Sequence, residues 1–148
     1  MRSRLCLVVA LVLMVGGAPT ASAQSADSLL QGSFWTQQGL NVISAWNERA
    51  RTPEGLYYAE LDRTWTPQDS TTQYPGMVGR HVFSNVAAYL MSGEDAHLHR
   101  ARTALDFMVE HGWDDQYGGW YNAVTRSGEI VDADKDLFIQ IYATMGVA

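Results

Sequence analysis

Histidine is the side chain whose pKa lies closest to neutrality, so the four histidines are the first candidates for proton transfer. His97 and His99 are two positions apart, and a helix would point them in different directions. His111 follows near the end of the same segment. None of these spacings is that of a zinc site. We therefore predict that these three histidines are solvated surface residues.

Three alternating aspartates, Asp132, Asp134 and Asp136, have the pattern that opens a calcium-binding loop. Such a loop also needs a glycine in its middle and a glutamate at its end, and this chain has Leu137 and Ala143 at those places. We therefore predict no calcium site here and no metal site elsewhere in the chain.

The beginning of the chain has the pattern of a cleavable secretion signal. Arg2 and Arg4 give a positive start, residues 5–17 are apolar but short for a membrane span, and residues 21–23 read Ala-Ser-Ala. Cys6 precedes most of the apolar run, which argues against a lipid attachment site. We predict a signal peptide over 1–23, cleavage after Ala23, and a secreted or periplasmic mature protein over 24–148.

The composition after the signal narrows the possible partners. It contains no cysteine, so disulfides and thiolate metal ligands are excluded. All 16 acidic residues remain but only eight of the ten basic ones, because Arg2 and Arg4 are removed, and the formal charge becomes −8. Such a charge disfavours nucleic acids and anionic membranes as partners. No later stretch is long enough to span a membrane, so we expect a globular domain.

Hydrophobic periodicity and turn residues divide the mature chain into four helices and two hairpins. The predicted order is a helix over 28–50, a hairpin over 55–67, helices over 74–91 and 94–110, a hairpin over 118–131, and a fourth helix from about Asp134 or Lys135. In the helix over 94–110 the apolar side chains recur on one face, which we expect to be buried: Leu98, Ala101, Leu105, Met108 and Val109. His97 should lie mostly away from that face.

The two predicted hairpins can be aligned with each other. Residues 55–57 match 119–121 at an offset of 64, and residues 61–63 match 124–126 at an offset of 63. A helix–hairpin unit of that length suits a ring of antiparallel helix pairs, in which each pair covers its neighbours. Only about two units fit, and the last apolar helix has no capping residues before Ala148. We expect the chain to be a piece of a longer protein.

Four segments, in this order and spacing, resemble the N-acylglucosamine 2-epimerase and cellobiose 2-epimerase family. Residues 46–63 are similar to the end of the family's first helix and its first hairpin. Gly-Arg-His-Val-Phe-Ser at 79–84 resembles its Gln-Ala-Arg helix, with Arg80 on the motif arginine. Gly-Gly-Trp-Tyr at 118–121 and Lys-Asp-Leu-Phe-Ile-Gln at 135–140 resemble a later hairpin and helix.

The resemblance implies an all-α (α/α)6 barrel with short β-hairpins between helices, of which about the first four helices are present. It also implies a sugar substrate, no cofactor, and a reaction in which histidines move the proton at C2 of an opened sugar through an enediolate. Polar donors must stabilise that charge. The family's catalytic histidines lie on later helices.

We predict three substrate-binding residues, the first two of which the resemblance implies. Arg80 would point into the barrel and donate to sugar oxygens, although an arginine on a helix can also serve only as an ion-pair partner. Phe138 stands where the family usually has a tyrosine, and it can stack on a sugar but not donate a hydrogen bond. Trp120 could form an aromatic platform, although an aromatic residue in a short hairpin against helix ends more often serves packing, which is the explanation we favour. Lys135 and Gln140 match the motif but could be contacts at the helix start.

His81 follows Arg80 directly, and adjacent helix positions point about 100° apart. It therefore need not share the same pocket.

Two other classes of function remain open, since the same ring of helices also hosts glycoside hydrolases and lyases. A hydrolase needs carboxylates on both sides of the scissile bond, and Asp114 and Asp115 are adjacent rather than an obvious flanking pair. The third possibility is a non-catalytic sugar-binding protein. It stays open because Phe138 stands where the family usually has a tyrosine.

Overall fold

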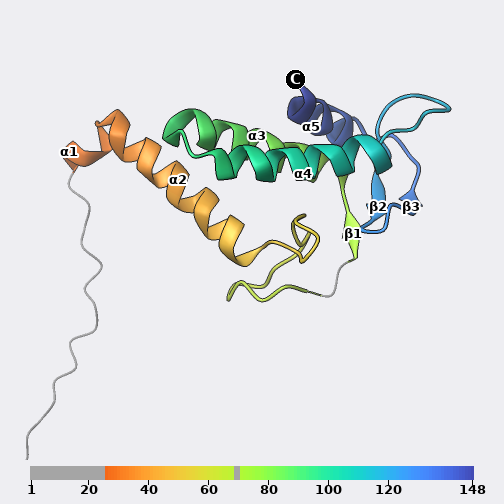
Figure 1. Cartoon of the computed structure of the whole chain (residues 1–148), viewed down its shortest axis with the longest axis horizontal. Helices are drawn as coiled ribbons and strands as arrows, with labels where there is room; N and C mark the ends of the chain where they lie inside the picture. Colours follow the sequence, from red (N-terminus) through yellow and green to blue (C-terminus); the bar gives the residue numbers. More distant parts are fainter. Residues whose placement is uncertain (1–25, 69–70) are drawn as a thin grey trace, which may run out of the picture.

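A computed structural model describes residues 26–68 and 71–148 (Figure 1). The elements are α1 (Ala26–Leu29), α2 (Gly32–Arg49), β1 (Thr72–Gln73), α3 (Pro75–Ser92), α4 (Asp95–His111), β2 (Ala123–Thr125), β3 (Ile130–Asp132) and α5 (Leu137–Val147). The predicted signal segment, 1–23, lies outside the described residues. Within them, no helix combines the length and hydrophobicity that crossing a membrane requires.

The central element is α3, which packs against both α4 and α5, while α2 contacts it and runs at an angle to it (Figure 1). Pro75 occupies the first turn of α3, where its missing N–H costs no hydrogen bond. The helix ends at Gly93, whose left-handed φ of 75° lets its N–H donate to the carbonyl of Tyr89. The chain then reverses into α4, and the predicted bounds of both helices are confirmed to within two residues.

The hydrophobic core lies where α3 meets α4 and α5. Its buried members are Val78, Val82, Ala101, Ala104, Met108, Trp120 and Ala143. Helices α3 and α5 approach closely at Gly79, because a Cβ there would lie only 2.8 Å from the Cα of Ala143. A glycine at this position is therefore a packing requirement.

The buried face of α4 differs from the predicted one. His97 is only 4% exposed, whereas Leu98 is 38% and Val109 55% exposed. The face against α3 instead contains Ala101, Ala104 and Met108 besides His97. The prediction that His97 is a solvated surface residue was wrong, because its ring nitrogen contacts Asn85 on α3 and a buried imidazole with a polar partner can join a core.

The second predicted hairpin is confirmed as β2 and β3, which pair in antiparallel fashion across the turn at Gly128. A third strand, β1, pairs with β2 through Thr72 opposite Thr125 and was not predicted. The first predicted hairpin, over 55–67, contains no strand. It contributes only single bridges, Arg51 to Tyr57 and Leu61 to Pro67.

The backbone pairing within the two hairpins nevertheless shows the predicted repeat. Leu61 bridges Pro67 in the first unit and Val124 pairs with Ile130 in the second, so both partners shift by the same 63 positions. The fourth helix begins later than predicted, at Leu137, because the carboxylate of Asp136 caps it by accepting the N–H of Phe138.

Candidate functional site

A cavity of about 290 Å³ lies between the end of α2, the segment that follows it, and α3. It is lined by Trp46, Ala50, Tyr58, Ala59, Leu61, Met77, Arg80, His81 and Ser84. Aromatic and aliphatic walls with a few polar groups are the usual composition of a small-molecule site. Two ring systems, one guanidinium and one imidazole make this cavity a candidate sugar site.

Arg80 is held over an aromatic ring at the edge of the cavity. Its guanidinium carbon lies 4.7 Å from the ring centroid of Tyr142, which is a cation–π distance. Phe138 meets the same tyrosine ring edge to face, at 4.5 Å between centroids. Two of the three predicted sugar contacts, Arg80 and Phe138, therefore share one neighbour, although Phe138 is not among the residues that line the cavity.

His81 lines the same cavity as Arg80, although the two are consecutive. The residue is 8% exposed, and Tyr57 stacks on its ring at 3.9 Å with an angle of 10° between the planes. Burial, helped by the positive charge of Arg80, lowers the pKa of His81 to about 4. Its imidazole is consequently neutral at physiological pH.

A buried polar network holds the tyrosine that supports His81. The hydroxyl of Tyr57 hydrogen-bonds to Asn47 on α2, and the amide of Asn85 on α3 donates to that hydroxyl at 2.9 Å. Nδ1 of His97 on α4 lies 3.4 Å from the oxygen of Asn85. Burial raises the pKa of Tyr57, so its hydroxyl stays protonated and can donate. Three helices thus position the ring that stacks on His81.

Trp120 lies apart from the cavity, in the core, and is 6% exposed. Its ring meets Trp113 edge to face at 5.0 Å. The described structure therefore supports packing as the role of Trp120, and we do not carry this residue into the candidate site.

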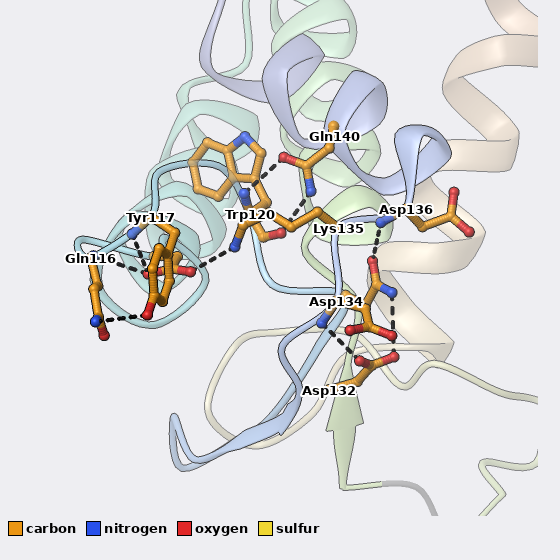
Figure 2. Close-up of polar contacts among 10 residues, drawn as sticks. Gln116, Tyr117, Trp120, Asp132, Asp134, Lys135, Asp136 and Gln140 are labelled. Carbon is orange, nitrogen blue, oxygen red and sulfur yellow. Dashed lines mark hydrogen bonds and ion pairs between the residues drawn. The ribbon is translucent and has the colours of Figure 1, made fainter.

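The other motif residues hold the second hairpin to the start of α5, as Figure 2 shows. Gln140 accepts the N–H of Trp120 at 2.8 Å and donates to its carbonyl at 2.6 Å. Lys135 makes an ion pair of 2.7 Å with Asp114, and the hydrogen bond from this lysine lowers the pKa of the carboxyl. These contacts are structural, as expected for residues at a helix start.

Neither of the other two histidines joins the cavity. His99 is exposed on α4, in agreement with its prediction, and His111 is half-buried beside Phe107, at 5.1 Å between ring centroids. Among residues 26–68 and 71–148 no group of three or more histidine, cysteine, aspartate or glutamate side chains could hold a metal ion.

Solved structures share this arrangement of helices and hairpins. A sugar epimerase from a ruminal bacterium superposes with a TM-score of 0.67 at 23% identity, over 76% of this chain and 30% of that one. Cellobiose 2-epimerase from Bacillus thermoamylovorans gives a TM-score of 0.65 at 22% identity, over 78% of this chain and 31% of that one. The fold is therefore that of part of an (α/α)6-barrel epimerase, and the predicted fold class is confirmed.

The sequence agrees with the fold. Residues 55–148 match the model of the N-acylglucosamine 2-epimerase (GlcNAc 2-epimerase) family, and the chain belongs to that family. The cellobiose 2-epimerase of Bacteroides fragilis is 21% identical over 123 residues, which are 82% of this chain. The chain spans about 31% of the length of that relative.

Proposed function

We propose that these residues form part of a sugar epimerase or isomerase that acts at C2 of a free mono- or oligosaccharide. Family membership supports the reaction class. The observation that carries the proposal to this chain is the cavity at the motif arginine, where Arg80 stands beside Trp46, Tyr58 and His81. Aromatic faces cover the apolar C–H surface of a sugar, and a guanidinium supplies N–H donors to its oxygens.

In the proposed reaction the sugar ring opens, a base removes the proton at C2, and the proton returns either to the other face of C2 or to C1. The first outcome inverts C2, and the second interconverts aldose and ketose. Arg80 would stabilise the negative oxygen of the enediolate, because its guanidinium carries a positive charge and N–H donors to the cavity. Histidines titrating near neutrality are the proposed bases.

His81 is a poor candidate for that base. With a pKa of about 4 its neutral form has little tendency to take up a proton at neutral pH. We therefore place the proton-transfer histidines outside the described residues, in the rest of the longer protein that its relatives lead us to expect.

Deuterium incorporation tests the proposed reaction directly. The whole protein is incubated in deuterated water with glucose, mannose, cellobiose and N-acetylglucosamine, and each sugar is analysed for label at C2 of the aldose and at C1 of any ketose. We expect label at C2 of at least one aldose together with its epimer, or label at C1 of the ketose that forms from it. A new reducing end without C2 label would support a hydrolase instead, and binding without any reaction would support a sugar-binding protein.

We also propose that the protein is exported, on the strength of the signal pattern in 1–23. An exported epimerase meets free sugars and oligosaccharides rather than nucleotide-linked ones, which is why the tested sugars are free. Expression of the whole gene in a bacterium and N-terminal sequencing of the extracytoplasmic protein should give Gln24 as the first residue. A product that starts at Met1 and stays in the cytoplasm would refute export.

A further inference from the structure

Two aromatic rings contact the imidazole of His81 and fix its orientation. Tyr57 covers one face of its ring at 3.9 Å, and the ring of Trp46 meets it at 5.3 Å with an angle of 67° between planes. Tyr57 is itself fixed by Asn47 and Asn85. The orientation of the imidazole is therefore set by α2 and the segment after it, before any ligand arrives.

No hydrogen bond joins a ring nitrogen of His81 to another group in the described part of the chain, yet His81 is not among the buried unpaired polar groups there, which are Arg51 Nε, Gln73 Oε1 and Arg100 Nε. Its ring therefore faces the cavity that it lines. His97, the other buried histidine, has its Nδ1 against Asn85 and its Nε2 3.9 Å from Glu94. A ring nitrogen that is open to a cavity can bond to water or to a ligand that replaces the water. The two buried histidines therefore differ, because His97 uses its hydrogen-bonding capacity within the protein and His81 presents its own to the cavity.

The chemistry of the cavity defines that partner. Trp46 and Tyr58 offer aromatic surface, and Arg80 offers only donors. A neutral imidazole adds one donor and one acceptor, so it can bond to a group that is itself both. A sugar hydroxyl is such a group, and a sugar ring also has the apolar face that the aromatic walls would cover.

We propose that His81 is a substrate-contacting residue that selects the sugar, through a hydrogen bond between one imidazole nitrogen and one hydroxyl of the sugar held against Arg80. This inference rests on the proposed function in that it takes the ligand to be a sugar. It goes beyond the reaction because His81 serves recognition and exchanges no proton with C2. The low pKa of the ring supports this role, since the hydrogen-bonding pattern of the site then does not change at ordinary pH.

Sugars that lack one hydroxyl test the contact. The affinity of the whole protein for glucose, mannose and each of their monodeoxy analogues is measured by calorimetry, for the native protein and for His81→Phe and His81→Gln. We expect His81→Phe to weaken binding of the parent sugar about tenfold, the effect of losing one hydrogen bond. One deoxy analogue should bind the native protein and His81→Phe equally, because it lacks the hydroxyl that His81 contacts. His81→Gln keeps a donor and an acceptor and should restore part of the affinity.

His111→Phe is the matched control. It removes a half-buried histidine that does not line the cavity, and it should leave the ranking of the deoxy sugars unchanged. If His81→Phe weakens all sugars by the same factor, or none, the inference is overturned, because a purely structural role would act in that way. If His81→Phe does not fold, the same comparison is made with His81→Gln against the deoxy series.

The outcomes also separate this inference from the proposed function. Selective loss of affinity without deuterium at C2 would uphold the contact and refute the reaction. Deuterium at C2 with an unchanged sugar ranking in both His81 variants would uphold the reaction and refute the contact. Failure of every sugar to bind would refute both.

Discussion

Arg80 offers a planar set of N–H donors, and its guanidinium carbon lies 4.7 Å from the ring centroid of Tyr142. Lysine keeps the charge but has neither the fork of donors nor the flat surface that stacks on tyrosine. We expect Arg80→Lys to raise KM for the sugar about tenfold, the loss of one good polar contact, and to lower kcat as well. Steady-state kinetics of C2 exchange measure both.

The control for Arg80 is Arg102→Lys on α4. Arg102 makes an exposed ion pair of 2.7 Å with Asp106 and does not line the cavity. An exposed pair contributes little, so this variant should keep native kinetics and a native melting temperature. Equal kinetic effects in the two variants would show that Arg80 has no special role.

His81 predicts a pH dependence of stability. The pKa of His81 is about 4 in the folded protein and 6.5 in the unfolded chain. Between pH 4 and pH 6.5 the unfolded chain therefore binds more protons than the folded protein. The free energy of unfolding therefore rises as the pH increases from 4 to 6.5, and this gain in stability is lost when the pH falls through the same range. Across the whole window from 6.5 to 4, this difference in pKa corresponds to about 3 kcal/mol.

Thermal unfolding at pH 4.5 and pH 7, for the native protein and His81→Gln, measures this contribution. The native protein should lose more stability on acidification than the variant, because glutamine does not titrate. Equal losses would mean that His81 is solvated or already protonated in the folded state.

The position of His81 could not be predicted from its place beside Arg80. Adjacent residues on a helix point about 100° apart, which is why a shared site was not expected. Arg80 and His81 both line the cavity because the segment after α2 folds over α3. This segment places Tyr58 on the cavity wall and Tyr57 against the ring of His81. Such contacts join residues that are distant in the sequence, so local sequence patterns do not predict them.

At the scale of the elements, Gln140 is the side chain that ties a hairpin to a helix (Figure 2). Its amide pairs with both the N–H and the carbonyl of Trp120, whose ring is in the core. Gln140→Leu keeps the size of the side chain but leaves two backbone groups of a buried residue without partners. We expect a loss of about 2–4 kcal/mol in stability, from one to two unsatisfied groups.

Melting temperature and tryptophan fluorescence of the whole protein check this prediction, with Gln116→Leu as the control. Gln116 is exposed and bonds only to the hydroxyl of Tyr117 through its side chain, so its loss should change stability by less than about 0.5 kcal/mol. A variant at Gln140 that melts like the native protein but binds sugar poorly would indicate a substrate contact instead.

The helices α3 and α4 could be predicted because their ends have strong local causes, Pro75 and Gly93 among them. The buried face of α4 could not, because ranking by hydrophobicity placed Leu98 and Val109 inside and His97 outside. The actual interface uses small residues, Ala101 and Ala104, with His97 reaching Asn85. Close helix packing and polar pairing outweighed side-chain hydrophobicity there.

Strand β1 was missed for a different reason. Thr72 and Gln73 are too few to show an alternating pattern, and they pair with Thr125 and Val124, which are distant in sequence. Gln73 is fully buried because its amide donates to the carbonyl of Tyr57. A polar residue buried through a long-range hydrogen bond leaves no local signal.

At the scale of the whole molecule, the apolar surface of α5 is the feature that the described residues leave uncovered. Leu137, Phe138 and Ile141 are more than half exposed on a helix whose other side packs on α3. In a ring of helix pairs each pair covers the next, and solved relatives are about three times as long as the matched region. We therefore expect residues 24–148, expressed alone, to associate through this surface and to bind a hydrophobic dye such as ANS.

Sedimentation velocity and ANS fluorescence of the 24–148 piece measure this, with Ile141→Lys as the comparison. A charge on the uncovered face of α5 should reduce association. It should not weaken the core that contains Val78 and Ala143, because that core lies on the opposite face of α5. Since a repeat unit cannot bury its apolar face by itself, the piece should also unfold without a sharp transition and show no C2 exchange. A monomeric piece that unfolds in one cooperative step would instead mean that α3, α4 and α5 form a stable core without further helices.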